Sequence, residues 1–542
     1  MLFWKFFGRV LASAFVVLLC IGNYHNSLRN EFAFDDYLAI VNNRDVMYGS
    51  NGTDHVSEYA KLWKNDIWGK DMKAVDSHRS YRPLLVTVFK LIVQLYGLNP
   101  WIFRAVSIFL HSVASIGVFY LSSLIFKSDS LAFGTALLFA SHPVHIESVA
   151  AVVNMAEAVS LIFSIAAFCI FYQSSEIISR DTSEDSYLSV KKAISIIVQL
   201  LLIAVWFGFL SLSLLFKETG ITVCGIIVAS SGTALLHTIK ASYLADRGKS
   251  LSVKMNGEKS RGLLRAAVSA TLRWSFKNVL WLLAALGGVF LYSVFRVILL
   301  VPDNPDQLNL LANLLRYLNI NNWGELRSKM ATSYLGESRL LRKAENPFSF
   351  LKGQEKILSM MYLHFRYFYQ LLWPENLCAE YAFDCIPKVS SLQDPRALLT
   401  IGFYVLLVSS FFYFLWWVAV PTREELKNVK KESPSAVVES DKEIKLKAGQ
   451  GSDKDKSARS VAWTTTYEHY LLSLVWMIVP FIPASGENIL SVCPCLSVPV
   501  FLSLSFCPCL SVLSLCPRLS VPVFLSLYFC LCLSVPVSSF PC

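Results

Sequence analysis

Residues 194–216 read ISIIVQLLLIAVWFGFLSLSLLF, and this run decides the fold. It contains no charged side chain, and it exceeds the length of about 20 apolar residues that a helix needs to cross a bilayer. Of the 542 residues in the chain, 54% are hydrophobic and only 16% are charged, against about 25% charged in a typical soluble domain. The sequence therefore predicts an all-α polytopic membrane helical bundle. It excludes a soluble globule, a disordered chain, collagen and a small disulfide scaffold.

Runs of similar composition divide the chain into about 9–11 predicted spans. The first run follows Lys5 and Arg9 and ends near Ile21, and because no small-residue cleavage site follows it, we interpret it as an uncleaved anchor. The other predicted spans lie at 102–126, 131–141, 149–173, 194–216, 219–237, 277–301, 397–420 and 463–484. Two further apolar stretches, 81–97 and 356–373, carry charged residues in their middle and are not expected to cross the membrane. We predict an interfacial helix at 81–97 and an interfacial or re-entrant helix at 356–373.

The distribution of charge predicts the topology. The formal net charge of +10 follows from 49 basic and 39 acidic residues, and the stretch 238–276 is strongly basic. The positive-inside rule assigns such a loop to the cytoplasm. Counting spans from a cytoplasmic N-terminus then gives a lumenal side that holds 24–100, 142–148, 217–218 and 302–396, and a cytoplasmic side that holds 174–193, 238–276 and the disordered linker 421–462. No glycine-rich repeat accompanies the basic residues, and their distribution follows the predicted topology, so no nucleic-acid partner is expected.

The first lumenal loop, 24–100, holds the one N-glycosylation acceptor triplet of the sequence, Asn51-Gly52-Thr53. We therefore expect Asn51 to carry a glycan. The same loop contains Asp35-Asp36 directly after the first span. Two adjacent carboxylates flanked by aromatic residues are candidates for a general base or a metal ligand. A helix cap or a turn is an equally weighted alternative, because Asp-Asp often serves that purpose.

Cations lie at two other predicted lumenal positions. Arg82 could bind a phosphate at headgroup depth through bidentate hydrogen bonds, but snorkelling of a flanking cation is the simpler interpretation. Lys217-Glu218 lies between two long apolar runs. This pair could form an internal salt bridge, or Lys217 could face a phosphate. Its location on the same side as Asp35 favours the phosphate.

A histidine motif, Ser141-His142-Pro143-Val144-His145-Ile146-Glu147, follows the short predicted span 131–141. On a helix, His142 and His145 would share a face, so a metal pair is one hypothesis. No third strong ligand has the spacing that a zinc site needs. We therefore favour a polar wall of a substrate pocket, formed by His142, His145 and Glu147, and expect no metal site here.

The last segment, 486–542, has an unusual composition. From Ile489 onward it contains no acidic residue and no lysine, and the sequence from Cys495 to Cys507 recurs almost unchanged from Arg518 to Cys530. Its frequent prolines prevent both stable helices and a regular sheet. We interpret this low-complexity Cys/Ser/Pro tail as a gene-model artefact or as readthrough of repetitive DNA.

Taken together, the motifs of residues 1–485 resemble the transmembrane and tetratricopeptide-repeat-containing (TMTC) family of protein O-mannosyltransferases. The segments that carry the resemblance are Phe34-Asp35-Asp36 with Ala39-Ile40-Val41-Asn42-Asn43, Ser80-Tyr81-Arg82-Pro83-Leu84, Gly97-Leu98-Asn99-Pro100-Trp101, His142-Pro143-Val144-His145, Lys217-Glu218 with Gly220-Ile221-Thr222-Val223, and the stretch from Asn346-Pro347 to Ile386-Pro387. The family's lumenal tetratricopeptide repeats have no counterpart after 485, and we expect them to be absent from this chain.

The resemblance implies a GT-C-type multi-span glycosyltransferase of the endoplasmic reticulum membrane. It would transfer mannose from dolichyl-phosphate mannose to Ser or Thr of secretory proteins. Asp35 and Asp36 would be the acidic pair, and Arg82 and Lys217 would stabilise the leaving phosphate. The remaining expected pocket residues are His142, His145, Glu147 and Glu218. A divalent cation remains an alternative cofactor, and a catalytically inactive membrane scaffold and a transporter remain alternative functions.

Overall fold

The structure is a computed structural model, and it is helical: no β-strand occurs among the residues that it describes. These residues are 2–47, 55–74, 77, 80–179, 188–232, 236, 240, 278–296, 348, 351–375, 377 and 385–419. Six described helices are long and apolar enough to cross a membrane: Phe6–Arg29, Pro100–Phe126, Val152–Ser174, Ile196–Phe216, Asn278–Arg296 and Pro395–Tyr413. The predicted fold class, an all-α membrane bundle, is therefore confirmed.

Three shorter apolar helices accompany these six, namely Pro83–Tyr96, Asp129–Ser141 and Glu218–Gly232. Two of them correspond to the predicted spans 131–141 and 219–237, and the third corresponds to the predicted interfacial stretch 81–97. The predicted span 463–484, the linker 421–462, most of the basic loop 238–276 and the tail 486–542 lie outside the described residues.

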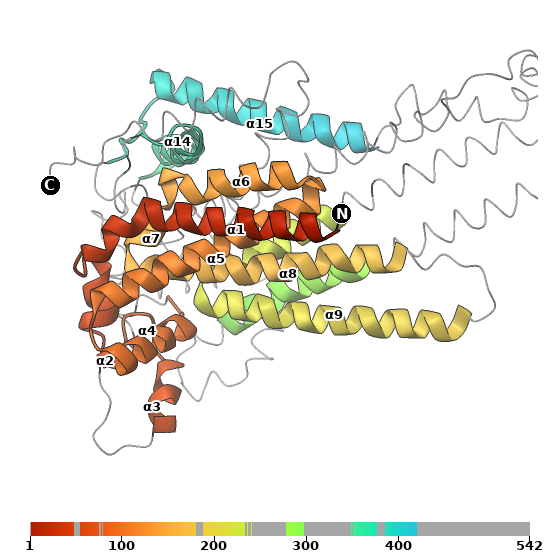
Figure 1. The fold of residues 1–542 in the computed structure, drawn as a ribbon. Helices are drawn as coiled ribbons and strands as arrows, with labels where there is room; N and C mark the ends of the chain where they lie inside the picture. Colours follow the sequence, from red (N-terminus) through yellow and green to blue (C-terminus); the bar gives the residue numbers. More distant parts are fainter. Residues whose placement is uncertain are drawn as a thin grey trace, which may run out of the picture.

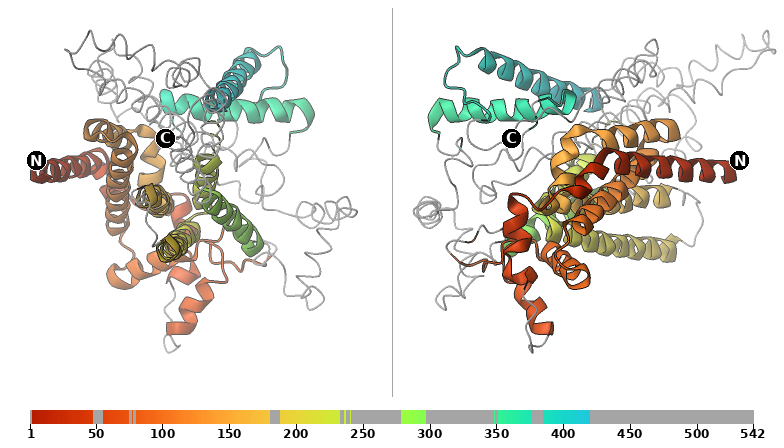
Figure 2. Two further views of the ribbon diagram at one scale, coloured as in Figure 1. Left: turned by 90° about the vertical axis from the view of Figure 1, so that its right-hand side faces the viewer. Right: turned by 60° about the vertical axis from the view of Figure 1, so that its left-hand side comes forward.

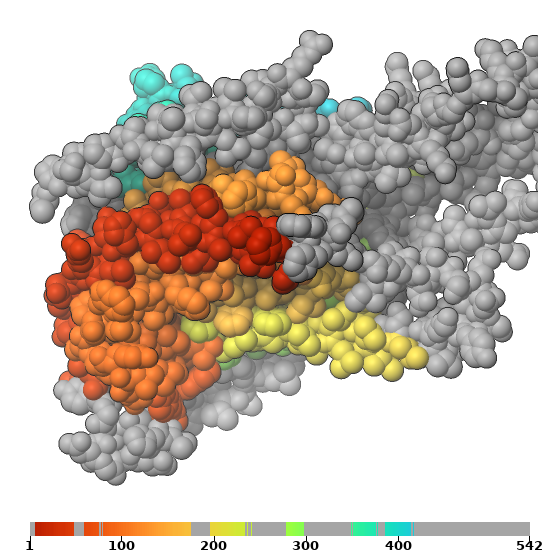
Figure 3. Space-filling model, viewed as in Figure 1, coloured from red at the N-terminus to blue at the C-terminus, as the bar shows by residue number. Residues whose placement is uncertain are grey.

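Four of the candidate spans and the shorter helix Asp129–Ser141 run side by side and form one bundle (Figure 1). Its members are α1 (Leu2–Tyr24), α5 (Pro100–Phe126), α6 (Asp129–Ser141), α8 (Met155–Ser179) and α9 (Leu188–Phe216). The space-filling view shows α1 lying against the orange surface of the following helices, with α9 on the opposite edge (Figure 3). A core of aromatic and aliphatic side chains joins α5, α8, α9 and the helix Asn278–Arg296. Within it, Trp206 and Trp281 are fully buried, with their ring centroids 5.9 Å apart.

The crossing of α8 and α9 depends on small side chains. The Ser213 hydroxyl lies 2.8 Å from the hydroxyl of Ser160 and 2.9 Å from that of Ser164. Gly220, in the 3₁₀ turn η5 (Glu218–Ile221) that follows α9, packs against the same serine. A Cβ atom at position 220 would lie 2.3 Å from the Ser213 Oγ and 3.0 Å from its carbonyl carbon. The turn that carries Lys217 and Glu218 is thus held tightly against the end of α9.

We expect Gly220→Ala to destabilise the protein by about 1–3 kcal/mol, because the added methyl group overpacks this contact. Gly208→Ala is the matched control, since it lies in α9 with no heavy atom within 4 Å of its ideal Cβ position. Thermal unfolding of the purified chain would measure both. Equal midpoints for the two variants would contradict a tight turn at Gly220.

The described parts of the predicted lumenal segments 24–100, 142–148 and 217–218 lie at one end of the bundle, on the left in Figure 1. The N-terminus of α1 lies at the opposite end, and so does the connection between α8 and α9. The left end contains α2 (Arg44–Met47), α3 (His55–Leu62), α4 (Pro83–Tyr96) and α7 (Ile146–Ala150). It also receives the first residues of α5 and α8 and the last residues of α9. All candidate site residues that the structure describes therefore lie at this end.

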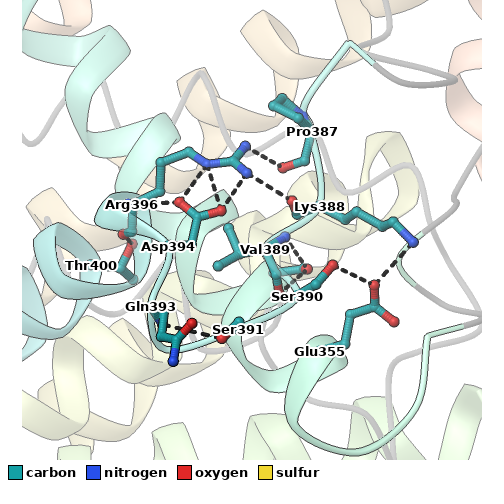
Figure 4. A network of polar contacts seen from close by, with 11 residues as sticks. Glu355, Pro387, Lys388, Val389, Ser390, Ser391, Gln393, Asp394, Arg396 and Thr400 are labelled. Carbon is teal, nitrogen blue, oxygen red and sulfur yellow. Dashed lines mark hydrogen bonds and ion pairs between the residues drawn. The ribbon is translucent and has the colours of Figure 1, made fainter.

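A helical pair completes the described fold. α14 (Gly353–Leu372) lies across the direction of the bundle helices, whereas α15 (Pro395–Ala419) runs roughly along it (Figures 1 and 2). α14 is not among the six candidate spans, and its orientation is the one that an interfacial helix takes. The described residues just before α15, 385–394, are rich in hydrogen bonds (Figure 4). The Arg396 guanidinium binds the Asp394 carboxylate and the carbonyls of Pro387 and Lys388, and Lys388 pairs with Glu355 at 3.0 Å.

Candidate active site

One hydrophobic cluster brings together the segments that carry the candidate residues. It contains Phe32, Ala39 and Ile40 from the first loop, Leu85 and Phe89 from α4, Val152, Val153, Met155 and Ala156 from the start of α8, and Phe216 from the end of α9. Each of these segments adjoins a charged candidate residue. Burial of this shared core therefore places the Asp35-Asp36 loop, Arg82 and Lys217 around one apolar centre.

Both carboxylate oxygens of Asp36 accept hydrogen bonds from backbone N–H groups. Its side chain is 1% exposed, and its two carboxylate oxygens accept hydrogen bonds from the N–H groups of Val153, at 3.0 Å, and Ala33, at 3.3 Å. Burial raises the pKa of the Asp36 carboxyl, although these two N–H groups oppose the shift. The first bond joins residues that are 117 positions apart in the sequence. Asp36 thus fixes the first loop to the segment that leads into α8, which is a structural role of the kind that the turn hypothesis describes.

Asp35 lies beside an unusual backbone conformation. Its side chain is half-buried. The preceding residue, Phe34, has φ of +47°, in the left-handed region that bulky residues rarely adopt, and its ring is 77% exposed. The Asp36 and Tyr37 N–H groups donate to the carbonyls of Ala33 and Phe34, which closes a tight turn. This turn leaves Asp35, and not Asp36, as the more accessible carboxylate of the pair.

A group of buried charges forms the second part of the site. The Arg82 Nη2 lies 3.3 Å from the Glu218 Oε2, with the two side chains only 6% and 8% exposed. The Lys217 ammonium contacts the Glu157 carboxylate, and these side chains are 2% and 1% exposed. Arg296, at the end of the helix Asn278–Arg296, also interacts electrostatically with Glu218. We call these five residues the charge cluster.

The charge cluster corrects one interpretation based on the sequence alone. Snorkelling, the simpler interpretation of Arg82, places a cationic head in water, whereas the Arg82 head is buried and paired with Glu218. Lys217 takes part in a buried internal ion pair, which was one of its two alternatives, but its partner is Glu157. Three cations and two carboxylates leave an excess of one positive charge, in surroundings where charges interact more strongly than in water. The Glu157 Oε2 atom has no hydrogen-bond partner among the described residues.

The histidines form a separate group, which includes His111 of α5. The His145 ring lies 5.2 Å from the ring of His111 and 4.4 Å from that of Phe139, measured between centroids. The His142 Nδ1 accepts a hydrogen bond from the Val144 N–H, so its Nε2 is the atom that donates to the Leu371 carbonyl, at 3.1 Å. His142 therefore ties the C-terminal end of α14 to the bundle. In the part of the chain that the structure describes, no group of three or more His, Cys, Asp or Glu is placed to hold a metal ion.

We expect acid to weaken this attachment of α14. Burial lowers the pKa of His142 to about 4, against the opposing hydrogen bond to Leu371, and it lowers the pKa of His145 well below its ordinary value. The unfolded chain therefore binds protons near pH 6.5 that the folded chain does not bind. The contribution of the neutral histidines to the free energy of unfolding is fully present above that pH, and it falls as the pH approaches 4. For His142 alone, the loss at pH 5 is roughly 2 kcal/mol.

Hydrogen exchange of α14 at pH 7 and pH 5, corrected for the intrinsic rate, would measure the effect. His142→Gln, which does not titrate, should reduce the pH dependence. A pH dependence that is identical in the two proteins would contradict the assignment.

Sequence reasoning missed several of these residues. Glu157, Arg296, Arg104 and His111 are all charged or polar residues within or at the ends of apolar runs. Ionisable residues in such places generally have a function or a partner, and that signal could have identified them. Among the predicted residues, Glu147 is half-buried and lies in α7 with the histidine group, and Asn51 lies outside the described residues.

Comparison with known proteins gives consistent matches. Residues 336–408, which include α14 and the start of α15, match the family described as Protein O-mannosyl-transferase TMTC, DUF1736. The chain is 39% identical to human Protein O-mannosyl-transferase TMTC1 over 204 residues, which cover 38% of this chain and 21% of that protein. It is 28% identical to human Protein O-mannosyl-transferase TMTC3 over 400 residues, or 72% of this chain and 34% of that protein.

A third relative extends the match further along the chain. Protein O-mannosyl-transferase tmtc2 of Xenopus laevis is 24% identical over 495 residues, which cover 88% of this chain and 49% of that protein. The chain thus spans less than half of the length of each of these three relatives.

Proposed function

Because the chain belongs to the TMTC family of protein O-mannosyl-transferases, we propose that it transfers mannose from dolichyl-phosphate mannose to Ser or Thr hydroxyls of proteins in the secretory pathway. The reaction would take place at the end of the bundle that holds the charge cluster, on the lumenal side of the endoplasmic reticulum membrane. A polyisoprenyl donor chain would lie in the bilayer, so that its phosphate and sugar reach this end.

Asp35 is the proposed general base. The acceptor hydroxyl oxygen attacks the anomeric carbon, and its proton passes to the Asp35 carboxylate. The bond from that carbon to the phosphate oxygen breaks, with the electron pair leaving on dolichyl phosphate. This assignment is supported by the half-buried position of Asp35 and by the two backbone hydrogen bonds that occupy Asp36. A displacement in one step inverts the configuration at the anomeric carbon.

The charge cluster is proposed to attract and stabilise the leaving phosphate. Arg82 and Lys217 are each held by a glutamate, so they act through the net positive potential of the cluster rather than as isolated cations. A preorganised positive potential stabilises charge that develops on the phosphate as the bond breaks. Glu157 and Glu218 hold the cations in place. His142, His145 and Glu147, which form a separate group at the same end of the bundle, are proposed as a polar wall outside the charge cluster.

A single observation carries the proposal. Asp36, beside the proposed base, accepts a hydrogen bond from Val153 in the segment that leads directly into Glu157, and Glu157 pairs with Lys217. A short chain of contacts therefore links the acidic motif to the cations, although these residues come from widely separated parts of the sequence.

Purified full-length chain in lipid nanodiscs provides the test. It would be incubated with labelled dolichyl-phosphate mannose, and in parallel with dolichyl-phosphate glucose, together with unfolded and folded secretory domains as acceptors. We expect mannose, with inverted configuration, on Ser or Thr of the acceptor. Parallel reactions with a chelator would determine whether a divalent cation is required.

A correctly folded chain that transfers no sugar to any acceptor would overturn the proposal and favour a membrane scaffold. Transfer of glucose in place of mannose would keep the reaction class and reject the donor.

A further inference from the structure

Arg104 is a buried cation that joins two loops at the site. It lies in the second turn of α5 and is 2% exposed. Its Nε donates to the Asn30 carbonyl at 2.9 Å, its Nη2 donates to the Glu31 carbonyl, and its Nη1 donates to the Ala150 carbonyl. The two carbonyls of the first loop and the one at the end of α7 therefore bind the same guanidinium.

Arg104 and Asp36 act on the same two segments. Arg104 joins residues 30–31 to residue 150, while Asp36 joins the turn at 33–36 to residue 153. The Arg104 guanidinium also attracts the Asp36 carboxylate electrostatically, so the two sets of contacts between these segments are coupled. Asp35 lies between these fixed points, so its backbone has little freedom to move relative to the start of α8.

We propose that Arg104 is a positioning residue for the transfer reaction, which holds the loop of Asp35 in register with the segment 150–157 that carries Glu157. This inference rests on the proposed function. Three carbonyls in different directions require the planar fork of a guanidinium, because an ammonium group at the end of a flexible chain does not present donors in that fixed arrangement. Lysine at position 104 should keep the charge and lose part of the register.

The test uses Arg104→Lys and Arg104→Met in full-length chain in nanodiscs, with two independent measurements. Hydrogen exchange should become roughly tenfold faster or more at the Ala33 and Val153 amides in Arg104→Met, while the middle of α8 stays protected. In the transfer assay, kcat should fall roughly 10- to 100-fold, and the KM for the donor should change less than twofold. Arg104→Lys should give an intermediate kcat.

Lys90→Met provides the matched control. Lys90 is also buried, at 2% exposed, and its Nζ donates to the Asp45 carbonyl at 3.2 Å, but the bond does not touch residues 30–36. Lys90→Met should not change kcat, and it should not change the rate of hydrogen exchange at the Ala33 and Val153 amides. A rise in KM with unchanged kcat in Arg104→Met would overturn the positioning role, and so would unchanged exchange.

If the parent chain transfers no sugar, the proposed function fails. Exchange at Ala33 and Val153 still decides separately whether Arg104 holds the loop.

Discussion

Asp35→Asn is expected to reduce mannosyl transfer by a factor of roughly 100 or more, with no change in the level or thermal stability of the protein. The substitution keeps the size of the side chain and removes the group that accepts the hydroxyl proton. Because Asp35 is half-buried and is not the residue that fixes the turn, the fold should tolerate the loss of its charge. Single-turnover assays with labelled donor, on protein of matched thermal midpoint, would measure the effect.

Asp36→Asn is the matched control for this prediction, since it makes the same chemical change one residue away. An asparagine oxygen can accept one of the two backbone hydrogen bonds, but its amide nitrogen cannot accept the other. The unpaired buried N–H group should cost about 1–3 kcal/mol of stability. We therefore expect the two variants to differ in kind, with Asp35→Asn stable and inactive and Asp36→Asn destabilised. The reverse pattern would assign the base to Asp36.

The contrast between Asp35 and Asp36 shows what the sequence could and could not predict about the site. The two adjacent carboxylates after a predicted span indicated that this loop matters. They also suggested two roles for it, a general base or a turn. Nothing in the local sequence shows which carboxylate has which role. The two roles differ because Asp36 accepts a hydrogen bond from the Val153 N–H, which is 117 residues away. Such contacts depend on how the helices pack, and they leave no trace in the spacing of residues.

The fold was predictable because bilayer thickness fixes the length of an apolar run. Residues 102–126 and 194–216 match α5 and the apolar part of α9 closely. The charge cluster was only partly predictable, because its pairing depends on contacts between residues that are far apart in the sequence. The sequence indicated Arg82 and Lys217 as cations at the membrane boundary, but burial and carboxylate partners arise from tertiary structure.

Breaking the buried pair of Lys217 and Glu157 should have the largest effect on stability. Lys217→Met leaves the Glu157 carboxylate buried without its partner, and such a loss costs about 3–5 kcal/mol. Glu157→Gln removes the carboxylate that the Lys217 ammonium contacts and should also destabilise the protein. The double variant removes both charges, so it should recover most of the lost stability. Lys217→Arg should be tolerated better than Lys217→Met because it keeps the charge.

The exposed pair of Arg9 and Asp129 provides a control for this cycle. Its atoms are 2.8 Å apart, but the side chains are 50% and 42% exposed. Arg9→Met should therefore cost only about 0–1 kcal/mol. Denaturant unfolding of the purified variants would supply all of these differences. If Lys217→Met costs no more than Arg9→Met, Lys217 and Glu157 do not form a buried ion pair. The double variant removes one cation and one carboxylate, so the net positive charge of the cluster is unchanged. If the double variant recovers stability and keeps transfer, the net positive potential serves catalysis and the pairing serves the fold. If it recovers stability and loses transfer, the reaction needs the Lys217 ammonium itself.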